Sequence, residues 1–170
     1  EVGKGHGIML INQRDIFDNI IVGKNISRNG VKLNNLVEYG EIIIAGVGTL
    51  GEGESFGRTL FAYEDLVGQL ISGEFIRMKT NDKVPSGYLY AWLSSDFGFR
   101  LIRSTHAGSK LCRPIQKLLL EKPVPIIEHD VMIKIDQMIK EAFTNRHISN
   151  LLEKEAIGIV EQEIEKWNNK

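Results

Sequence analysis

The sequence has very little cysteine, few aromatic residues and almost no net charge. Its one cysteine, Cys112, excludes a framework of disulfide bonds and suits a reducing compartment, so we expect a cytoplasmic protein. No apolar run approaches the roughly 18 residues that cross a bilayer. With 21 Lys and Arg against 22 Asp and Glu, the overall charge points to neither a nucleic acid nor a membrane. An initiator Met is also missing, so we expect a fragment or a trimmed chain.

Proline is absent after Pro125, and Gly158 is the only glycine beyond residue 128, which together predict helix for the last forty residues. Apolar residues recur there at helical spacing in two stripes: Val131, Ile135, Met138 and Ala142, then Ile157, Val160, Ile164 and Trp167. The stripes do not continue into each other, so we expect one long helix with a register break, or two helices with Asn150 capping the second. A helix of this length would measure about 60 Å, too long to be buried on one small domain, which favours a spacer or assembly surface.

The first two thirds of the chain are richer in strand patterns. Short apolar or alternating runs predict strands at residues 8–12, 42–45, 58–63 and 74–79. Residues 25–35 are predicted to form an exposed polar loop or hairpin. From Pro85 a helical pattern begins, in which Tyr88, Trp92 and Leu93 share a buried face. We therefore predict an α+β fold with a β-rich domain at residues 1–126 and a helical arm at residues 127–170.

Signals of catalysis are missing. The glycines that follow the isoleucine run, at positions 46, 48, 51, 53 and 57, have no Lys-Ser/Thr pair and no helix after them, and Glu52 and Glu54 lie among them. These three features argue against a phosphate-binding loop and favour a glycine-rich hairpin or loop end between two strands. The histidines show no metal-ligand spacing, and Cys112 is expected to be a small core residue rather than a nucleophile. The prediction is a protein without enzymatic activity, cofactor or metal.

Polar residues around the strand ends have the side chains that contact DNA. Asn, Gln and Arg side chains read base edges in pairs of hydrogen bonds, and Asn12, Gln13 and Arg14 follow the first strand directly. Between Phe97 and Leu120 there is no acid, which predicts a local basic face. The other expected contacts to phosphate, sugar or groove are Lys24, Lys32, Arg100, Arg103, Ser104, Thr105, His106, Ser109, Lys110 and Arg113. The open alternatives are that Arg14 pairs with Asp15 and that the loops are merely solvated.

Four stretches, in order, resemble the target-recognition domain of the specificity subunit of Type I restriction–modification enzymes. They read IMLINQRDI (8–16), YGEIIIAGVGTLGE (39–52), GYLYAWLSSDFGFRLI (87–102) and AGSKLCRPIQKLLLEKPVPI (107–126). In that family the first is a strand, the second a strand and glycine turn, the third a helix, and the fourth a strand closing in a Pro-x-Pro segment. Two departures are Glu41, where the family usually has Asp, and Ile126 to His129, where it has a Glu-Gln pair.

The resemblance implies a DNA-binding subunit that places partner methyltransferase (modification) and restriction subunits on double-stranded DNA. It also implies that the arm is a coiled-coil spacer pairing with a second copy or second half of the specificity subunit. A full subunit has two recognition domains and two helices, so this chain would be a half-subunit, a fragment, or the recognition module of a fused methyltransferase–nuclease. A different class remains open, namely a protein–protein adaptor that acts through its helical arm.

Overall fold

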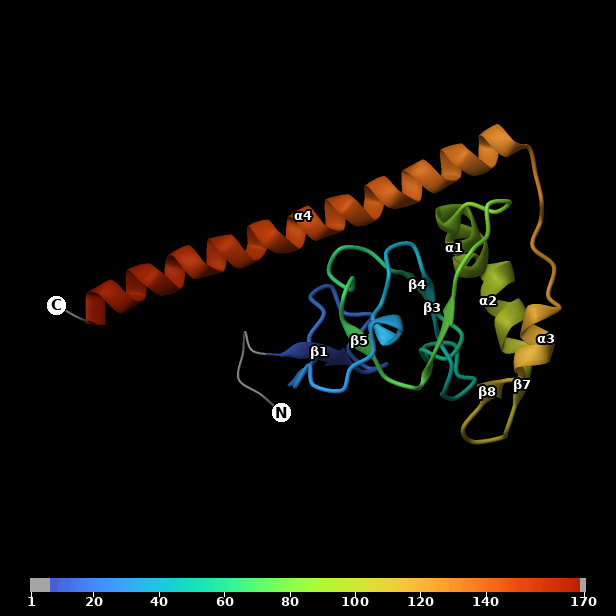
Figure 1. The fold of residues 1–170 in the computed structure, drawn as a ribbon, viewed down its shortest axis with the longest axis horizontal. Coiled ribbons are helices and arrows are strands. Elements are labelled where there is room, and N and C mark those ends of the chain that lie inside the picture. Colours follow the sequence, from blue (N-terminus) through green and yellow to red (C-terminus); the bar gives the residue numbers. More distant parts are fainter. Residues whose placement is uncertain (1–6, 169–170) are drawn as a thin grey trace.

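The computed structural model describes residues 7–168 and has mixed α+β content, as the sequence predicts (Figure 1). The strands are β1 (Ile8–Ile11), β2 (Lys24–Ile26), β3 (Ile42–Ala45), β4 (Thr59–Phe61), β5 (Leu70–Ile71), β6 (Phe75–Met78), β7 (His106–Ala107) and β8 (Arg113–Pro114). The helices are the short 3-10 helix η1 (Leu33–Asn35), α1 (Ser86–Ser94), α2 (Asp96–Arg103), α3 (Gln116–Leu120) and α4 (His129–Asn168).

Within the described residues the strands form three small sheets. β1 pairs antiparallel with β2 and parallel with β5, β3 pairs antiparallel with both β4 and β6, and β7 pairs antiparallel with β8. The four predicted strands correspond to β1, β3, β4 and β6 and are confirmed. The exposed loop or hairpin expected at 25–35 begins in strand β2, where Asn25 lies opposite Met9 at the edge of a sheet.

Strand β3 is the centre of the core. Ile42, Ile43 and Ile44 have no exposed surface. Ile43 belongs to a cluster with residues of β1 and α4, while Ile42 and Ile44 face a second cluster formed with α1, α2 and α3. Both faces of the strand are covered, which explains an apolar run without alternation. Burial of each side chain stabilises the fold by about 1.5–3 kcal/mol.

The helical pattern after Pro85 is divided into two helices. Ser95 separates α1 from α2, and its Oγ accepts a hydrogen bond from the backbone N–H of Gly98 at 3.1 Å, as an N-cap does. A Cβ on Gly98 would lie 2.2 Å from the carbonyl oxygen of Trp92, so only glycine lets the two helices meet this closely. Tyr88 and Leu93 are buried as predicted, whereas Trp92 is only half-buried.

One element departs from the resemblance. The stretch 107–126 was expected to contain a closing strand of the family, but residues 116–120 form helix α3. Leu119 is buried in the cluster of α1 and α2, so the short helix packs its apolar side chain inward. The segment around Pro123 and Pro125 then leads to α4 without regular structure.

Helix α4 is continuous over 40 residues, which confirms the expectation of one long helix and excludes the alternative of two helices. Figure 1 shows the helix crossing the body beside α1, with its C-terminal part extending beyond the rest of the described chain. Asn150 is not a cap: it is buried in the helix, and its Nδ2 donates to the Asn19 carbonyl at 3.1 Å and to Asp65 Oδ2 at 2.8 Å.

The apolar stripe predicted for the first half of α4 is one position out of register. Val131, Met138 and Ala142 are exposed and Ile135 is half-buried, whereas the buried positions are Met132, Asp136, Phe143 and Asn150, with Ile139 packed against the core. Counting onward from Asn150 in steps of three and four residues reaches Ile157, Val160, Ile164 and Trp167. The contact face and the second stripe therefore form one heptad series along the whole helix.

Two contacts fix α4 on the body. A Cβ on Gly87 would lie 2.8 Å from the Asp136 carbonyl oxygen, so α1 and α4 cross in backbone contact. The Asp136 carboxylate accepts from the Gly87 N–H at 2.7 Å, at the first turn of α1, and also pairs with Lys140. Farther along, the Phe143 ring lies 5.2–5.4 Å from the rings of Phe61, Tyr63 and Tyr90.

Candidate nucleic-acid interface

The glycine-rich loop, residues 46–58, connects β3 to its antiparallel neighbour β4. This confirms the predicted hairpin connection. The chain passes from the loop directly into a strand, so no helix N-terminus is present there to hold a phosphate. Gly57 has a φ of +81°, the left-handed conformation that favours glycine, and its backbone N–H donates to Ala45 O at 2.8 Å to close the loop.

The first anchor of the loop is Gln13, at the end of β1. Its Nε2 donates to the Val47 carbonyl at 2.5 Å and to Ser55 Oγ at 3.0 Å, and its Oε1 accepts from the Val47 N–H at 3.3 Å. The side chain is 9% exposed. All its polar atoms are thus used inside the protein, and the prediction that Gln13 reads a base is replaced by a role in holding the loop.

The second anchor is Arg103, in the last turn of α2. Its Nη2 donates to the carbonyls of Thr49 at 3.2 Å and Gly51 at 2.9 Å, and its guanidinium lies over the Phe99 ring at 4.7 Å. Only 8% of the residue is exposed, which is incompatible with the predicted phosphate contact. Arg100, by contrast, is 61% exposed and pairs with Asp96 at 3.1 Å.

The third anchor is a pair of backbone hydrogen bonds. The N–H of Cys112 donates to Gly48 O at 2.7 Å, and the N–H of Gly48 donates to Cys112 O at 3.2 Å. The Cys112 side chain is fully buried, as predicted for a core residue. The glycine loop is therefore held from β1, from α2 and from the connection between β7 and β8.

Three further predicted contacts are tied to the end of α2. Thr105 is fully buried and its Oγ1 donates to Ile102 O at 2.6 Å, which excludes a role on the surface. Ser104 is exposed and its Oγ donates to Leu101 O at 2.7 Å, and His106 Nδ1 lies 2.8 Å from Arg103 O. These hydrogen bonds satisfy carbonyls that a helix end leaves unpaired.

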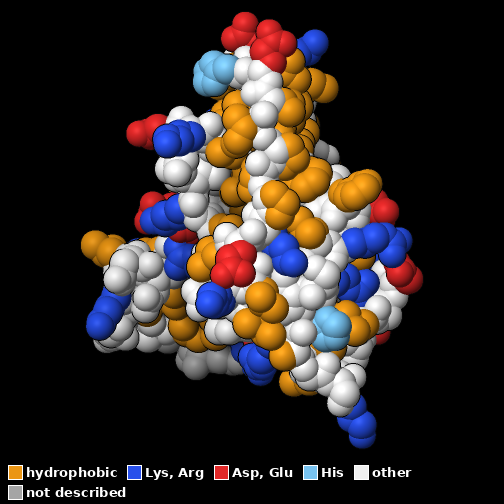
Figure 2. Space-filling view, turned by 90° about the vertical axis from the view of Figure 1, so that its right-hand side faces the viewer, with side chains coloured by type: hydrophobic (Ala, Val, Ile, Leu, Met, Phe, Trp, Pro, Cys, Tyr) orange, Lys and Arg blue, Asp and Glu red, His pale blue; other side chains and the backbone are white. Residues whose placement is uncertain are grey.

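The remaining predicted contacts are scattered. Ser109, Lys110 and Arg113 are exposed on the β7–β8 hairpin, beside the glycine loop. Lys24 is exposed on β2, and Lys32 is exposed directly before η1. Asn12 is half-buried in a turn, in which its carbonyl accepts a hydrogen bond from the Asp15 N–H. Figure 2 shows Lys and Arg spread around a central band of hydrophobic side chains on one face of the molecule. Within the acid-free stretch, Arg103 is buried and Arg100 is paired with Asp96, so the stretch does not form one basic patch.

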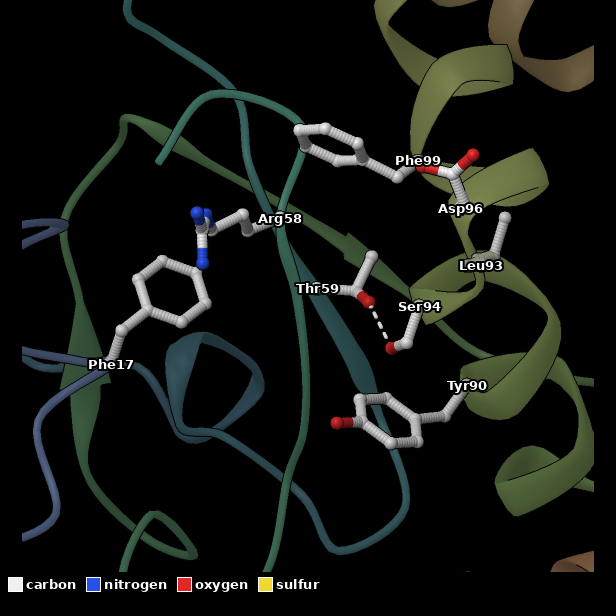
Figure 3. A pocket seen from close by; sticks show the side chains of 8 residues that line it. All are labelled: Phe17, Arg58, Thr59, Tyr90, Leu93, Ser94, Asp96 and Phe99. Carbon is white, nitrogen blue, oxygen red and sulfur yellow. Dashed lines mark hydrogen bonds between the residues drawn. The ribbon is translucent and has the colours of Figure 1, made fainter. Parts of the chain in front are cut away.

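Two adjoining hollows lie along the anchored loop. The first, about 400 Å³, is shown in Figure 3 and is lined by Phe17, Arg58, Thr59, Tyr90, Leu93, Ser94, Asp96 and Phe99. The second, about 580 Å³, is lined by Gln13, Arg14, Phe17, Val47, Gly48, Thr49, Gly53, Glu54, Ser55, Arg58, Glu74 and Leu111. They share Phe17 and Arg58, so these two residues form the boundary between them.

Both hollows offer hydrogen-bond donors and acceptors. In the second, the exposed Arg14 and Arg58 lie with Glu54 and Glu74; in the first, the hydroxyl groups of Thr59 and Ser94 are 2.5 Å apart. Arg14 makes no ion pair with Asp15 within residues 7–168. A mixture of guanidinium and carboxylate groups matches base edges, where guanine presents acceptors and cytosine a donor, better than it matches phosphate alone.

Sequence reasoning missed Arg58, which belongs to both hollows. The available signal was its position: a lone basic residue directly after the glycine that closes the loop. Among the described residues, no group of three or more His, Cys, Asp and Glu is arranged to hold a metal ion.

The second candidate surface is the C-terminal part of α4. Every residue from Leu151 to Trp167 except Gly158 is exposed. The predicted assembly residues Ile157, Val160, Ile164 and Trp167 are 48–73% exposed and contribute a row of uncovered apolar side chains.

No protein-family model matches the chain, and no curated protein matches it. A search of the described helices for a span long and apolar enough to cross a membrane finds none.

Proposed function

We propose that this chain recognises duplex DNA sequence-specifically, as the specificity component of a restriction–modification complex. The observation that carries the proposal is the glycine loop, which three buried anchors hold next to the exposed side chains of Arg14 and Arg58. Because partners supply methyl transfer and cleavage in this proposal, the chain itself needs no catalytic group or cofactor.

The anchoring supports the proposal on energetic grounds. A loop that is already fixed loses little conformational entropy when it binds, so more of the interaction energy appears as affinity. Gln13, Arg103 and the Gly48–Cys112 pair restrain the loop from three directions without occupying its outer side. Lys110 and Arg113 are exposed on the neighbouring hairpin, and in this proposal they contact the phosphates that flank the bases.

The arm supports the second half of the proposal. A row of apolar side chains on a helix that extends beyond its own domain is suited to pairing with another helix. We propose that this row binds a second copy or second half of the specificity subunit, and that the paired arms dock the modification and restriction subunits.

The experiment that tests the proposed function is affinity selection from a randomised pool of DNA duplexes, at low and moderate salt, with and without the cognate methyltransferase subunit. Enrichment of a short fixed motif is the expected result. Binding without enrichment would reduce the role to phosphate contact, and absence of binding in both arms would reject DNA recognition.

A second candidate function, an adaptor that works through the arm alone, is favoured by the exposed stripe itself. Arg14→Ala and the pair Val160→Asp with Ile164→Asp separate the two. An adaptor loses partner binding only with the arm variants, whereas a DNA reader loses base discrimination with Arg14→Ala. That loss should be about 1–3 kcal/mol at one base position if Arg14 reads guanine.

A further inference from the structure

Arg58 lies where the glycine loop ends and β4 begins. Its backbone N–H donates to Ser55 O at 2.8 Å, and its carbonyl accepts from the Ala45 N–H at 2.9 Å. The backbone at this position is therefore fixed on both sides, by the loop and by the end of β3.

The side chain of Arg58 is oriented by one hydrogen bond and is otherwise free. Its Nε donates to the Glu54 carbonyl at 3.1 Å, while its two terminal amino groups have no hydrogen-bond partner in the described part of the chain. Figure 3 shows the guanidinium on the side of the hollow where the Phe17 ring lies. The exposed fork thus carries two parallel N–H donors that the protein itself does not use.

Other arginines near the core are used internally. Arg77 binds Glu41, Arg103 binds the glycine loop, and Arg146 donates to the Asp18 carbonyl at 2.7 Å. Asp96 lines the first hollow together with Arg58. Its carboxylate is paired with Arg100 at 3.1 Å and not with Arg58. The Arg58 guanidinium at the boundary of the two hollows is therefore oriented by a hydrogen bond but forms no ion pair among the described residues.

We propose that Arg58 is a specificity-determining residue that reads a guanine, with its two terminal amino groups donating to O6 and N7. This inference rests on the proposed function and identifies a base contact within it. Because Nε is used in the hydrogen bond to Glu54, the two terminal nitrogens Nη1 and Nη2 remain for the base. Together they can donate the pair of hydrogen bonds by which arginine recognises guanine. Phe17, which lines both hollows with Arg58, supplies an apolar wall beside it.

The test repeats the duplex selection with Arg58→Ala, Arg58→Lys and Lys83→Ala, followed by affinity measurements on single-base variants of the selected site. Lys83→Ala is the matched control, because it removes the same charge from an exposed turn that lines neither hollow. Arg58→Lys keeps the charge but not the planar fork, so it separates base reading from phosphate attraction.

We expect Arg58→Ala and Arg58→Lys to lose the preference for G·C at one position, with affinity for the cognate site falling about 5- to 150-fold and affinity for the variant at that position unchanged. Lys83→Ala should keep the full motif. Equal weakening on all sites, or an unchanged motif in Arg58→Ala, would overturn the inference while leaving the proposed function standing. Failure of the wild-type chain to enrich any motif would overturn both. Unchanged thermal unfolding of the variants would show that they fold.

Discussion

The side-chain amide of Gln13 and the backbone of Val47 form a reciprocal pair, in which each residue donates one hydrogen bond to the other. This pair joins the end of β1 to the start of the glycine loop across 34 residues of sequence. It makes the position of the candidate DNA-contacting loop depend on a residue that is itself inaccessible to DNA.

Gln13→Ala should lower both stability and DNA affinity. The substitution leaves the Val47 N–H and carbonyl unpaired in a buried place, which costs about 1–3 kcal/mol in the free energy of unfolding. Urea unfolding measures the loss, and hydrogen exchange of residues 46–58 should accelerate. Arg14→Ala is the adjacent control, because an exposed residue without internal partners should change stability by less than about 0.5 kcal/mol. Equal stability of the two variants would contradict the anchoring role.

Arg77→Ala should be strongly destabilising. Its Nη2 and Nε donate to the two carboxylate oxygens of Glu41 at 2.7 and 2.8 Å, and the Glu41 side chain is only 2% exposed. Removing one partner of a buried ion pair costs about 3–5 kcal/mol, and the only other cation paired with the Glu41 carboxylate among the described residues is the exposed Lys79, at 3.5 Å. Lys166→Ala is the comparison: its pair with Glu163 is exposed on both sides and should contribute less than about 1 kcal/mol. A double-mutant cycle on Glu41 and Arg77, followed by chemical unfolding, would test the coupling.

Acid should loosen the attachment of α4 through Asp65. Burial alone would raise the pKa of this carboxyl group, but hydrogen bonds from Asn150 and His147 outweigh it and hold the pKa below its ordinary value. Because the pKa is depressed in the folded state, the resulting stability is present above the unfolded pKa of about 4 and is lost as the pH falls through the folded value.

Asp65→Asn should accordingly make the free energy of unfolding depend less on pH below about pH 4. Asn150→Ala should raise the pKa of Asp65, so that acid unfolding occurs at higher pH. NMR titration of the Asp65 carboxyl group, together with unfolding midpoints between pH 2 and 6, checks both. An acid limb that is identical in wild type and Asp65→Asn would refute the assignment.

Phe143→Ala and Val160→Ala test the two halves of the α4 stripe. Phe143 is 8% exposed within a cluster of aromatic rings, so its truncation should cost about 3–5 kcal/mol. Val160 is 58% exposed and belongs to neither core cluster of the described residues, so its truncation should leave unfolding of the chain nearly unchanged. Under the proposed arm pairing, Val160→Ala should instead weaken self-association, measured by sedimentation equilibrium.

Four strands, β1, β3, β4 and β6, were predictable because their signals are local. The isoleucines of β3 and the alternating residues of β6 predict strands from the local sequence alone. By contrast, two adjacent residues after β1 differ in burial: Gln13 is buried and Arg14 is exposed. Both carry side chains that can read bases, and only the tertiary packing of the glycine loop decides which one faces outward.

The register of α4 was misread for a physical reason. The true contact face contains Asp136 and Asn150, which are polar yet buried because Gly87 and Asp65 satisfy them. A search for apolar residues at helical spacing therefore passed over that face and selected the neighbouring row through Val131 and Met138, which is exposed. Buried polar contacts between distant parts of the chain leave no such local pattern.

The single heptad series along α4 determines how far another helix can run beside it. Since the same series faces the body up to Asn150, a helix that pairs along this side meets the body there and can proceed no farther. Among the described residues, the track beyond this point runs from Leu151 to Trp167, about 25 Å at 1.5 Å per residue. The body of the protein thus sets the N-terminal limit of any helix that pairs along this side.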